Sequence, residues 1–355
     1  MSLADPSIQV KSTQIASLNL LRGFAALYVC CYHILPAAFE SIPFLHSTFS
    51  FGYLGLDLFF IISGFIIPYS MFKNDYSLKR FPKFMLKRSV RIEQPYIVSF
   101  LIIIFARYLY VQIHNWQYPE YYWPFRHDWK QFGLHFFYLN QYFGYESYAP
   151  VYWTLAIEFQ FYLLIGFLFP LIIGTKKIIP VTLLVLSSAF IWFFDFRYNW
   201  FIFQYGYLFI TGILIFLFTV KRISFKVFSL LFVVIATLLY FKNGLDVLVT
   251  AVAGTVAIIS IKREWKVTNF LGTISYSLYL IHCEAAGWIT NYLDTVIKNR
   301  MVLCVSAVLF AIGFATLLWY FVERPALKLS KKIRYNKKQF LAETVPVLDL
   351  EANKE

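Results

Sequence analysis

The chain is dominated by long apolar runs that alternate with short polar connections. About 20 apolar residues in a helix cross the hydrocarbon core of a bilayer, so each run predicts a membrane-spanning helix. We therefore expect an all-α integral membrane protein, a bundle of about ten transmembrane helices. The predicted spans cover residues 16–36, 51–72, 90–112, 150–173, 178–194, 200–220, 225–241, 245–261, 270–292 and 301–322.

Polar segments at both ends delimit this predicted bundle. Residues 1–15 form a polar tail, and residues 330–355 form a charged tail whose composition favours disorder or loose attachment. Residues 16–329 then form one transmembrane domain. We expect no soluble catalytic domain at either end, so that any chemistry takes place in the bundle or its loops.

Lys and Arg residues are concentrated in alternate connections between the predicted spans. The connection 73–91 carries seven of them, the connection 37–50 carries none, and the alternation continues along the chain without exception. Basic residues mark the cytoplasmic side of a membrane protein. The pattern predicts that both termini are cytoplasmic, and a bacterial cytoplasmic (inner) membrane is the expected location. The residues interpreted only as orientation charges are Lys73, Lys79, Arg80 and Lys83.

Composition narrows the classes of protein that fit this pattern. Hydrophobic residues make up 59% of the chain and its mean hydropathy is +0.61, which excludes an ordinary soluble protein of this size. The net charge of +13 first suggests nucleic-acid binding, but its distribution at helix ends indicates membrane orientation instead. The four cysteines lie inside predicted spans without disulfide or metal-ligand spacing, so we predict no metal site.

The first span carries two ionisable residues at membrane depth, Arg22 and His33. Such residues are costly in a bilayer and indicate function by default. Eleven helical residues turn through about 1,100° and rise roughly 16 Å, so the two side chains share one helix face. With the predicted orientation, Arg22 lies near the cytoplasmic side and His33 near the outer side.

Each of these two residues also has a purely structural interpretation. His33 is a candidate general base, because histidine titrates nearest to neutral pH, but it could also be a core histidine bonded to a backbone carbonyl. Arg22 is a candidate phosphate ligand, but it could also snorkel to the cytoplasmic interface. Arg88 and Arg91 lie at the predicted cytoplasmic start of the third span, where they suit either phosphate binding beside a helix N-terminus or simple anchoring.

Glu158 is another ionisable residue predicted at membrane depth, similar in depth to His33. An unpaired carboxylate there is costly, so a partner is expected. Glu158 could hold His33 in one tautomer and stabilise its imidazolium, as in nucleophile–base–orienter sites. Alternatively, it could pair with Arg107 or Tyr162 and serve only to hold helices together. Asp57, nearer the outer side, is either an acceptor-binding or an interfacial residue.

The ninth span carries a polar stripe, and the second span a Ser-Gly pair. Ser275, Tyr279 and His282 follow one another at spacings of four and three residues, so they share a face. Such a stripe lines a cavity or hydrogen-bonds another helix. Ser63 could carry an acyl group, but a Ser-Gly pair more simply serves close helix packing.

The connection between the third and fourth spans, residues 113–149, is long and rich in aromatic residues. The predicted orientation makes it external. Long loops with this much packing material are usually functional or re-entrant. We consider two interpretations, an interfacial aromatic belt and a platform on which carbohydrate rings stack.

Six motifs in this order resemble the membrane-bound acyltransferase-3 family, which O-acylates surface carbohydrates and some small molecules. They extend over residues 18–325, nearly the whole chain, and the ordered set is far more specific than any one motif. The motifs are Arg22 and His33 with ten residues between them, FGYLGLDLFFIISGFII, KRSVRIEQPY, VYWTLAIEFQFYLL, FLGTISYSLYLIH and FVERP.

The resemblance implies that acyl-CoA delivers its acyl group from the cytoplasm to an acceptor on the other side. It also implies that Arg22 and His33 match the family's essential basic residue and histidine. Leu56, where the family more usually has Val, and Gln94 before Pro95 depart from its pattern. The other matching positions are Gly52, Gly55, Asp57, Phe59, Phe60, Ser63, Gly64, Arg88, Arg91, Trp153, Glu158, Tyr162, Tyr279 and His282.

Together these observations predict an acyl-CoA-dependent membrane O-acyltransferase, most simply an O-acetyltransferase. The roughly 16 Å rise from Arg22 to His33 is comparable with an extended pantetheine arm, so one acyl-CoA could contact both residues. His33 and Glu158 are the predicted catalytic residues. The predicted acyl-CoA ligands are Arg22, Arg88 and Arg91. The residues predicted to bind the acceptor, a surface or lipid-linked carbohydrate, are Asp57, Trp153, Tyr162, Tyr279 and His282.

Two other hypotheses remain open at this point. One is a polytopic transporter or flippase of a glycan or lipid-linked precursor, in which the intramembrane charges form a substrate path. The other is the same acyl transfer to a lipid or small-molecule acceptor. Direct transfer and a two-step route through an acyl-enzyme both fit the residues.

Overall fold

The structure, a computed structural model of the chain, describes residues 13–36, 39–40, 43–113, 129–174, 201–261 and 265–333. Every regular element in these ranges is a helix and none is a strand, which confirms the predicted all-α class. The principal helices are α1 (Thr13–Ile34), α2 (Pro43–Ser50), α3 (Leu54–Lys73), α4 (Phe81–Ile113), α6 (Trp129–His135), α7 (Trp153–Gly174), α9 (Gly206–Thr219), α10 (Phe225–Asn243), α11 (Leu245–Ser260), α12 (Lys266–Leu293), α13 (Arg300–Leu318) and α14 (Arg324–Lys332).

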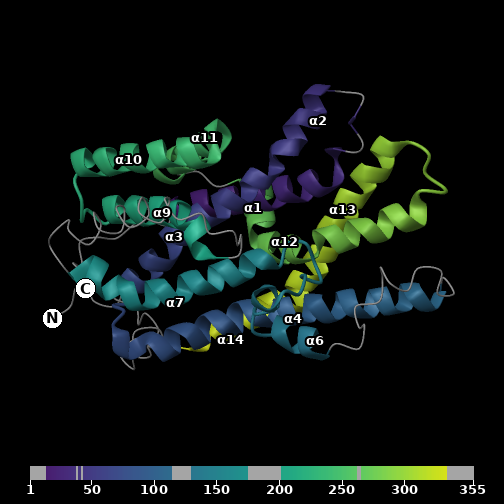
Figure 1. Cartoon of the computed structure of the whole chain (residues 1–355), viewed down its shortest axis with the longest axis horizontal. Coiled ribbons are helices and arrows are strands. Elements are labelled where there is room, and N and C mark those ends of the chain that lie inside the picture. The colour runs from purple at the N-terminus through teal and green to yellow at the C-terminus, as the bar shows by residue number, and fades with distance from the viewer. Residues whose placement is uncertain are drawn as a thin grey trace, which may run out of the picture.

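The long helices form a layered bundle. In Figure 1, α4 and α14 lie together along the lower edge, α7 runs above them, and α9 and α10 form the upper left part. The most extensive helix contacts are those of α1 with α12, α12 with α13, and α3 with α9. The helices α1 and α12 therefore lie against each other for much of their length.

Nine of the ten predicted spans correspond to described helices, and the remaining one, residues 178–194, lies outside the described residues. The helices α1 and α12, of 22 and 28 residues, are long enough to cross a bilayer. They carry polar side chains of the site, and their stretches are less apolar than the five that follow. The stretches that qualify as spans by both length and composition are Pro43–Lys73, Leu78–Tyr110, Trp153–Gly174, Phe225–Asn243 and Arg300–Lys332.

Two helix boundaries differ from the prediction in ways that matter for the site. Helix α4 begins at Phe81 rather than at residue 90, so Arg88 and Arg91 lie inside it and not beside a helix N-terminus. The predicted contribution of a helix N-terminus to phosphate binding by this pair is therefore absent. After α13 the helix continues through a π-helical turn, Trp319–Glu323, into α14, which extends to Lys332 within the predicted tail.

The apolar core consists of two clusters that share α7. One is built mainly from α3, α7, α9, α10 and α11, and the other from α1, α4, α7, α12 and α13. Inside a bilayer, such clusters are held by close van der Waals packing rather than by removal of apolar surface from water. The polar residues of the site lie between and beside these two clusters.

Glycines permit the two closest helix crossings. A Cβ atom on Gly272 would lie 2.2 Å from the carbonyl oxygen of Asn19, so α12 and α1 touch backbone to backbone. A Cβ atom on Gly64 would lie 2.1 Å from the carbonyl oxygen of Phe209, where α3 crosses α9. The second crossing agrees with the packing role expected for the Ser63–Gly64 pair.

Candidate active site

Three arginines meet in one cavity of about 310 Å³. Arg22 reaches it from α1, and Arg88 and Arg91 reach it from α4, so the structure brings together all three predicted acyl-CoA ligands. Two carboxylates, Glu158 and Glu323, line the same cavity. Three guanidiniums and two carboxylates leave one positive charge for an anionic ligand. We call this space the arginine cavity.

Aromatic rings hold Arg88 in place. Its guanidinium lies 5.6 Å from the centroid of the Phe84 ring and 5.7 Å from that of the Tyr162 ring. Both distances permit cation–π attraction, and the residue is almost completely buried. A guanidinium fixed in this way presents a rigid planar fork, which suits bidentate binding of phosphate or carboxylate oxygens.

Glu158 lies among the arginines and not beside His33. Its carboxylate accepts a short hydrogen bond from the Tyr162 hydroxyl and a second from Ser63 Oγ at 3.3 Å, and its charge acts on Arg22. The expected contact with His33 is therefore replaced by one of the expected alternatives, the pair with Tyr162. Tyr162, predicted to bind the acceptor, lines the arginine cavity together with Glu158.

Glu323 is a site residue that the sequence interpretation missed. It is the central residue of the FVERP motif, is 4% exposed, and lies on the π-helical turn that follows α13. Its carboxylate accepts hydrogen bonds from Ser277 Oγ at 2.6 Å and from the Ser277 N–H at 3.2 Å. The charges of Arg22 and Arg91 act on it. An acidic residue directly after an apolar span was the available signal.

His33 lies in a second cavity, of about 400 Å³. Asp57 and Trp153, both predicted acceptor-binding residues, line this cavity with it, as do Tyr205 and Asp246, which the prediction did not include. The side chain of His33 is exposed to the cavity, whereas that of Asp57 is 7% exposed. We call this space the histidine cavity.

One wall separates the two cavities. Leu56 and Tyr279 line both of them. The Tyr279 hydroxyl lies 2.7 Å from Thr154 Oγ1 and donates to the carbonyl oxygen of Val151 at 3.2 Å. A chemical group bound against Leu56 or Tyr279 can therefore contact ligands in either cavity.

His282 is in direct contact with His33. The centroids of the two imidazole rings lie 5.2 Å apart, and His282 is completely buried. Its Nδ1 lies 3.1 Å from the Leu278 carbonyl oxygen and 3.0 Å from that of Tyr279, so this nitrogen carries the proton and donates. His282 thus belongs to the site, but as a neighbour of His33 rather than as a residue lining the histidine cavity.

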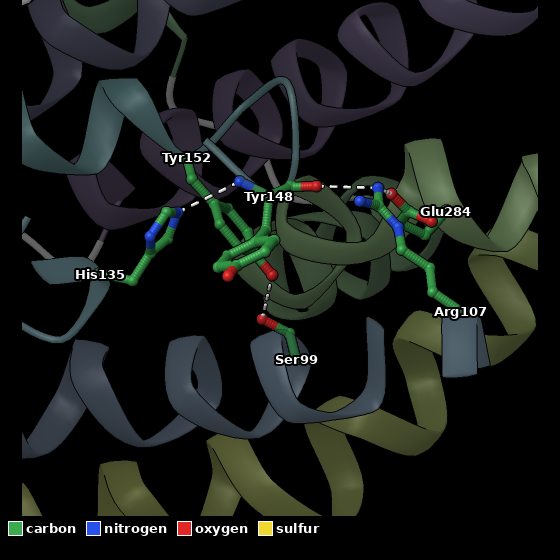
Figure 2. Close-up of polar contacts among 6 residues, drawn as sticks. All are labelled: Ser99, Arg107, His135, Tyr148, Tyr152 and Glu284. Atoms are coloured by element: carbon green, nitrogen blue, oxygen red, sulfur yellow. Dashed lines mark hydrogen bonds and ion pairs between the residues drawn. The ribbon is translucent and has the colours of Figure 1, made fainter. Parts of the chain in front are cut away.

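The described part of the aromatic connection, residues 129–149, packs into the bundle. His135 is completely buried and accepts a hydrogen bond from the Tyr148 N–H at 3.1 Å, as Figure 2 shows. Arg107 of α4 donates to the Tyr148 carbonyl oxygen at 2.8 Å and forms an ion pair with Glu284 of α12. This part of the connection is thus anchored to the bundle, while aromatic side chains such as Trp129, Phe137 and Phe143 remain exposed, so both interpretations stay open. Residues 114–128 lie outside the described ranges.

A family model described as an acyltransferase domain matches residues 15–322. The chain belongs to the acyltransferase-3 family. The match covers both cavities, with Glu323 directly beyond its end, and it favours a membrane acyltransferase over the transporter or flippase considered above. The expectation of a multi-pass membrane protein agrees with both the family and the apolar helices.

The chain also resembles one curated protein over part of its length. It is named "Putative acetyltransferase ORF330", comes from Acidianus two-tailed virus, and is 29% identical over 172 residues. The match covers 48% of this chain and 46% of the relative, so the two are similar over less than half of either length. No solved structure matches the chain.

Proposed function

We propose that this acyltransferase moves an acyl group, most simply acetyl, from acyl-CoA to a hydroxyl of a surface or lipid-linked carbohydrate. The observation that supports this most strongly is the position of Arg22 and His33 on one helix. Arg22 lines the arginine cavity, His33 lines the histidine cavity, and the cavities share a wall. One helix thus joins a site for an anionic donor to a base for a hydroxyl acceptor.

The arginine cavity suits the narrow part of the donor. Its volume of about 310 Å³ is at the lower end for ligand pockets, enough for an extended pantetheine arm but not for a whole coenzyme A. In this proposal Arg22, Arg88 and Arg91 bind the phosphates near the predicted cytoplasmic side. The thioester then extends toward Tyr279, since the helix rises roughly 16 Å between Arg22 and His33.

The histidine cavity supplies the acceptor side of the reaction. His33 takes the proton of the acceptor hydroxyl, and the oxygen attacks the thioester carbonyl carbon beside Tyr279. The new C–O bond forms, the C–S bond breaks, and the proton passes from His33 to the departing CoA sulfur. Glu158 acts on the donor side here, where it positions Tyr162 and balances the charge of Arg22.

The lining of the histidine cavity favours a sugar as acceptor. The rings of Trp153 and Tyr205 lie with their centroids 5.6 Å apart, and Asp57 and Asp246 add carboxylates that accept hydrogen bonds from hydroxyl groups. Flat aromatic rings beside acceptor oxygens suit a ring that carries hydroxyls on its rim. A lipid or small-molecule hydroxyl is the alternative acceptor. The proposed location is a bacterial cytoplasmic membrane with the arginine cavity facing the cytoplasm.

Labelled acetyl-CoA tests this function directly. Membranes that contain the enzyme are expected to place base-labile label on polysaccharide, and His33→Ala should abolish it. His46→Ala, a change to a histidine of α2 away from both cavities, is the matched control and should retain full labelling. Labelling that persists in His33→Ala removes His33 as the base. Label that appears only in a lipid or small-molecule fraction overturns the carbohydrate acceptor.

The donor side needs a separate measurement. Loss of one charge-assisted hydrogen bond to phosphate costs about 1.5–3 kcal/mol, so Arg22→Ala should weaken acetyl-CoA binding by roughly 10–100-fold. Lys83→Ala removes an exposed positive charge from α4 outside the cavity and should leave the affinity unchanged. Equal affinities in all three proteins would contradict the assignment of the arginine cavity to the donor.

A further inference from the structure

A cluster of nitrogen and sulfur atoms lies beside the histidine cavity, and the acyl-transfer proposal uses only one of its three residues, His33. One ligand atom each from His33, His282 and Cys283 can be chosen such that all lie within 4.8 Å of one another. His33 comes from the last turn of α1, and the other two are neighbours on α12. The contact between α1 and α12 therefore brings together residues that are far apart in the sequence.

His282 is already prepared to bind a cation. Its Nδ1–H donates to backbone carbonyls, which fixes the tautomer and leaves the lone pair on Nε2. Among the described residues, Nε2 is buried and has no hydrogen-bond partner. Metal-binding histidines commonly show this arrangement, with one ring nitrogen held by a carbonyl and the other directed at the metal. A buried nitrogen lone pair without a partner is otherwise costly.

We propose that His33, His282 and Cys283 bind one divalent transition-metal ion such as Zn²⁺, and that this ion inhibits the enzyme. Imidazole nitrogen and thiolate sulfur are ligands that Zn²⁺ prefers, whereas Mg²⁺ and Ca²⁺ prefer oxygen. Three protein ligands leave the fourth position open to the histidine cavity. On binding, the Cys283 thiol loses its proton to water and its sulfur bonds to the ion.

The spacing of the three atoms makes this a reversible site rather than a permanent one. In a tetrahedral zinc site the ligand atoms lie about 3.3–3.6 Å apart, so the widest separation here must shrink by about 1 Å. Such movement lowers the affinity compared with a preformed site. The exposed side of His33 gives an ion a direct route from the cavity.

Inhibition follows from the use of His33, and this consequence rests on the proposed function. A bound ion takes the nitrogen lone pair with which His33 would accept the acceptor proton. The base is then lost while the fold stays intact. Metal binding itself does not depend on the catalytic role, so the two proposals are tested separately.

The binding test uses purified protein in detergent, stripped with a chelator and then equilibrated with Zn²⁺. Wild type is expected to hold one ion per chain by elemental analysis, and His282→Gln and Cys283→Ser should each bind at least tenfold more weakly. Cys304→Ser changes a buried cysteine of α13 and serves as the matched control. Size-exclusion profiles of all variants confirm folding.

A second reporter distinguishes the proposed ligands from adventitious surface binding. Co²⁺ in place of Zn²⁺ should give the intense thiolate-to-metal absorption of a cysteine ligand, and Cys283→Ser should remove it while Cys304→Ser retains it. Equal Zn²⁺ contents in Cys283→Ser and wild type, or a Co²⁺ spectrum without the thiolate band, overturn the site.

The inhibition test measures acyl transfer with and without Zn²⁺. Wild type should lose activity reversibly and recover on addition of chelator, whereas Mg²⁺ should have no effect. Cys283→Ser should keep its basal activity and require at least tenfold more Zn²⁺ for the same inhibition. Identical inhibition of wild type and Cys283→Ser overturns the inhibitory role. A protein that binds Zn²⁺ as expected but transfers no acyl group refutes the proposed function and leaves the metal site standing.

Discussion

The crossing of α1 and α12 offers a sharp test of how the bundle builds the two cavities. Gly272→Ala would place a Cβ atom 2.2 Å from the carbonyl oxygen of Asn19, whereas ordinary van der Waals contact begins at 3.4 Å. The helices must then separate by about 1 Å or distort locally. Gly287 lies on the same helix, but a Cβ atom there meets no heavy atom within 4 Å, so Gly287→Ala is the matched control.

The expected change in the free energy of unfolding differs in sign between these two variants. Alanine favours a helix over glycine by about 1 kcal/mol in water-exposed positions, and both variants gain up to this amount. Overpacking costs typically about 1–3 kcal/mol, and more when the clashing atom is backbone, and only Gly272→Ala bears this cost. We expect Gly272→Ala to be less stable than Gly287→Ala by about 2–3 kcal/mol.

Thermal unfolding of the purified protein measures this difference. Cys30 and Cys304 are free and buried, so a thiol-reactive fluorogenic dye reports unfolding. At about 2–4 °C per kcal/mol for a larger domain, the Tm of Gly272→Ala should lie roughly 5–10 °C below that of Gly287→Ala. Gly272→Ala should also weaken acetyl-CoA binding, because Arg22 follows Asn19 by less than one helical turn. Equal Tm values for the two variants would refute the close backbone contact.

Three further predictions concern polar groups that the structure places inside the bundle. Burial lowers the pKa of His135 to about 4. The stability that the neutral side chain gives above pH 6.5 is therefore lost as the pH falls toward 4, by about 2 kcal/mol at pH 5. The Tm of wild type should drop more between pH 7.5 and pH 5 than the Tm of His135→Gln, and parallel profiles would contradict this. A double-mutant cycle of Arg107→Met and Glu284→Gln should give a coupling energy of about 1–3 kcal/mol in denaturation, and additive effects would show that the ion pair contributes nothing. Glu323→Ala should lower stability more than Glu323→Gln does, by about 1–3 kcal/mol, because Gln retains an oxygen for the hydrogen bonds from Ser277; equal losses in a thermal scan would contradict this role for the acceptor oxygen.

The sequence by itself determined the helical class, the position of nearly every described helix, and the shared face of Arg22 and His33. These are local properties. The length of an apolar run fixes whether a helix can cross a membrane, and the fixed rise and turn of a helix decide which side chains lie in line. The same regularity puts Arg88 and Arg91 on neighbouring positions of one helix, although the apolar pattern predicts a later start for α4 than Phe81.

Only the tertiary structure decided which polar side chains contact one another. The sequence predicts Glu158 about level with His33, yet its carboxylate lies in the arginine cavity and accepts hydrogen bonds from Tyr162 and Ser63. A residue's position along its own helix does not fix the direction of its side chain around the helix axis. Glu323 enters the site through a π-helical turn that no sequence periodicity reports. The contact of His33 with His282 likewise depends on how two distant helices cross, which is set by packing between them and not by either sequence segment alone.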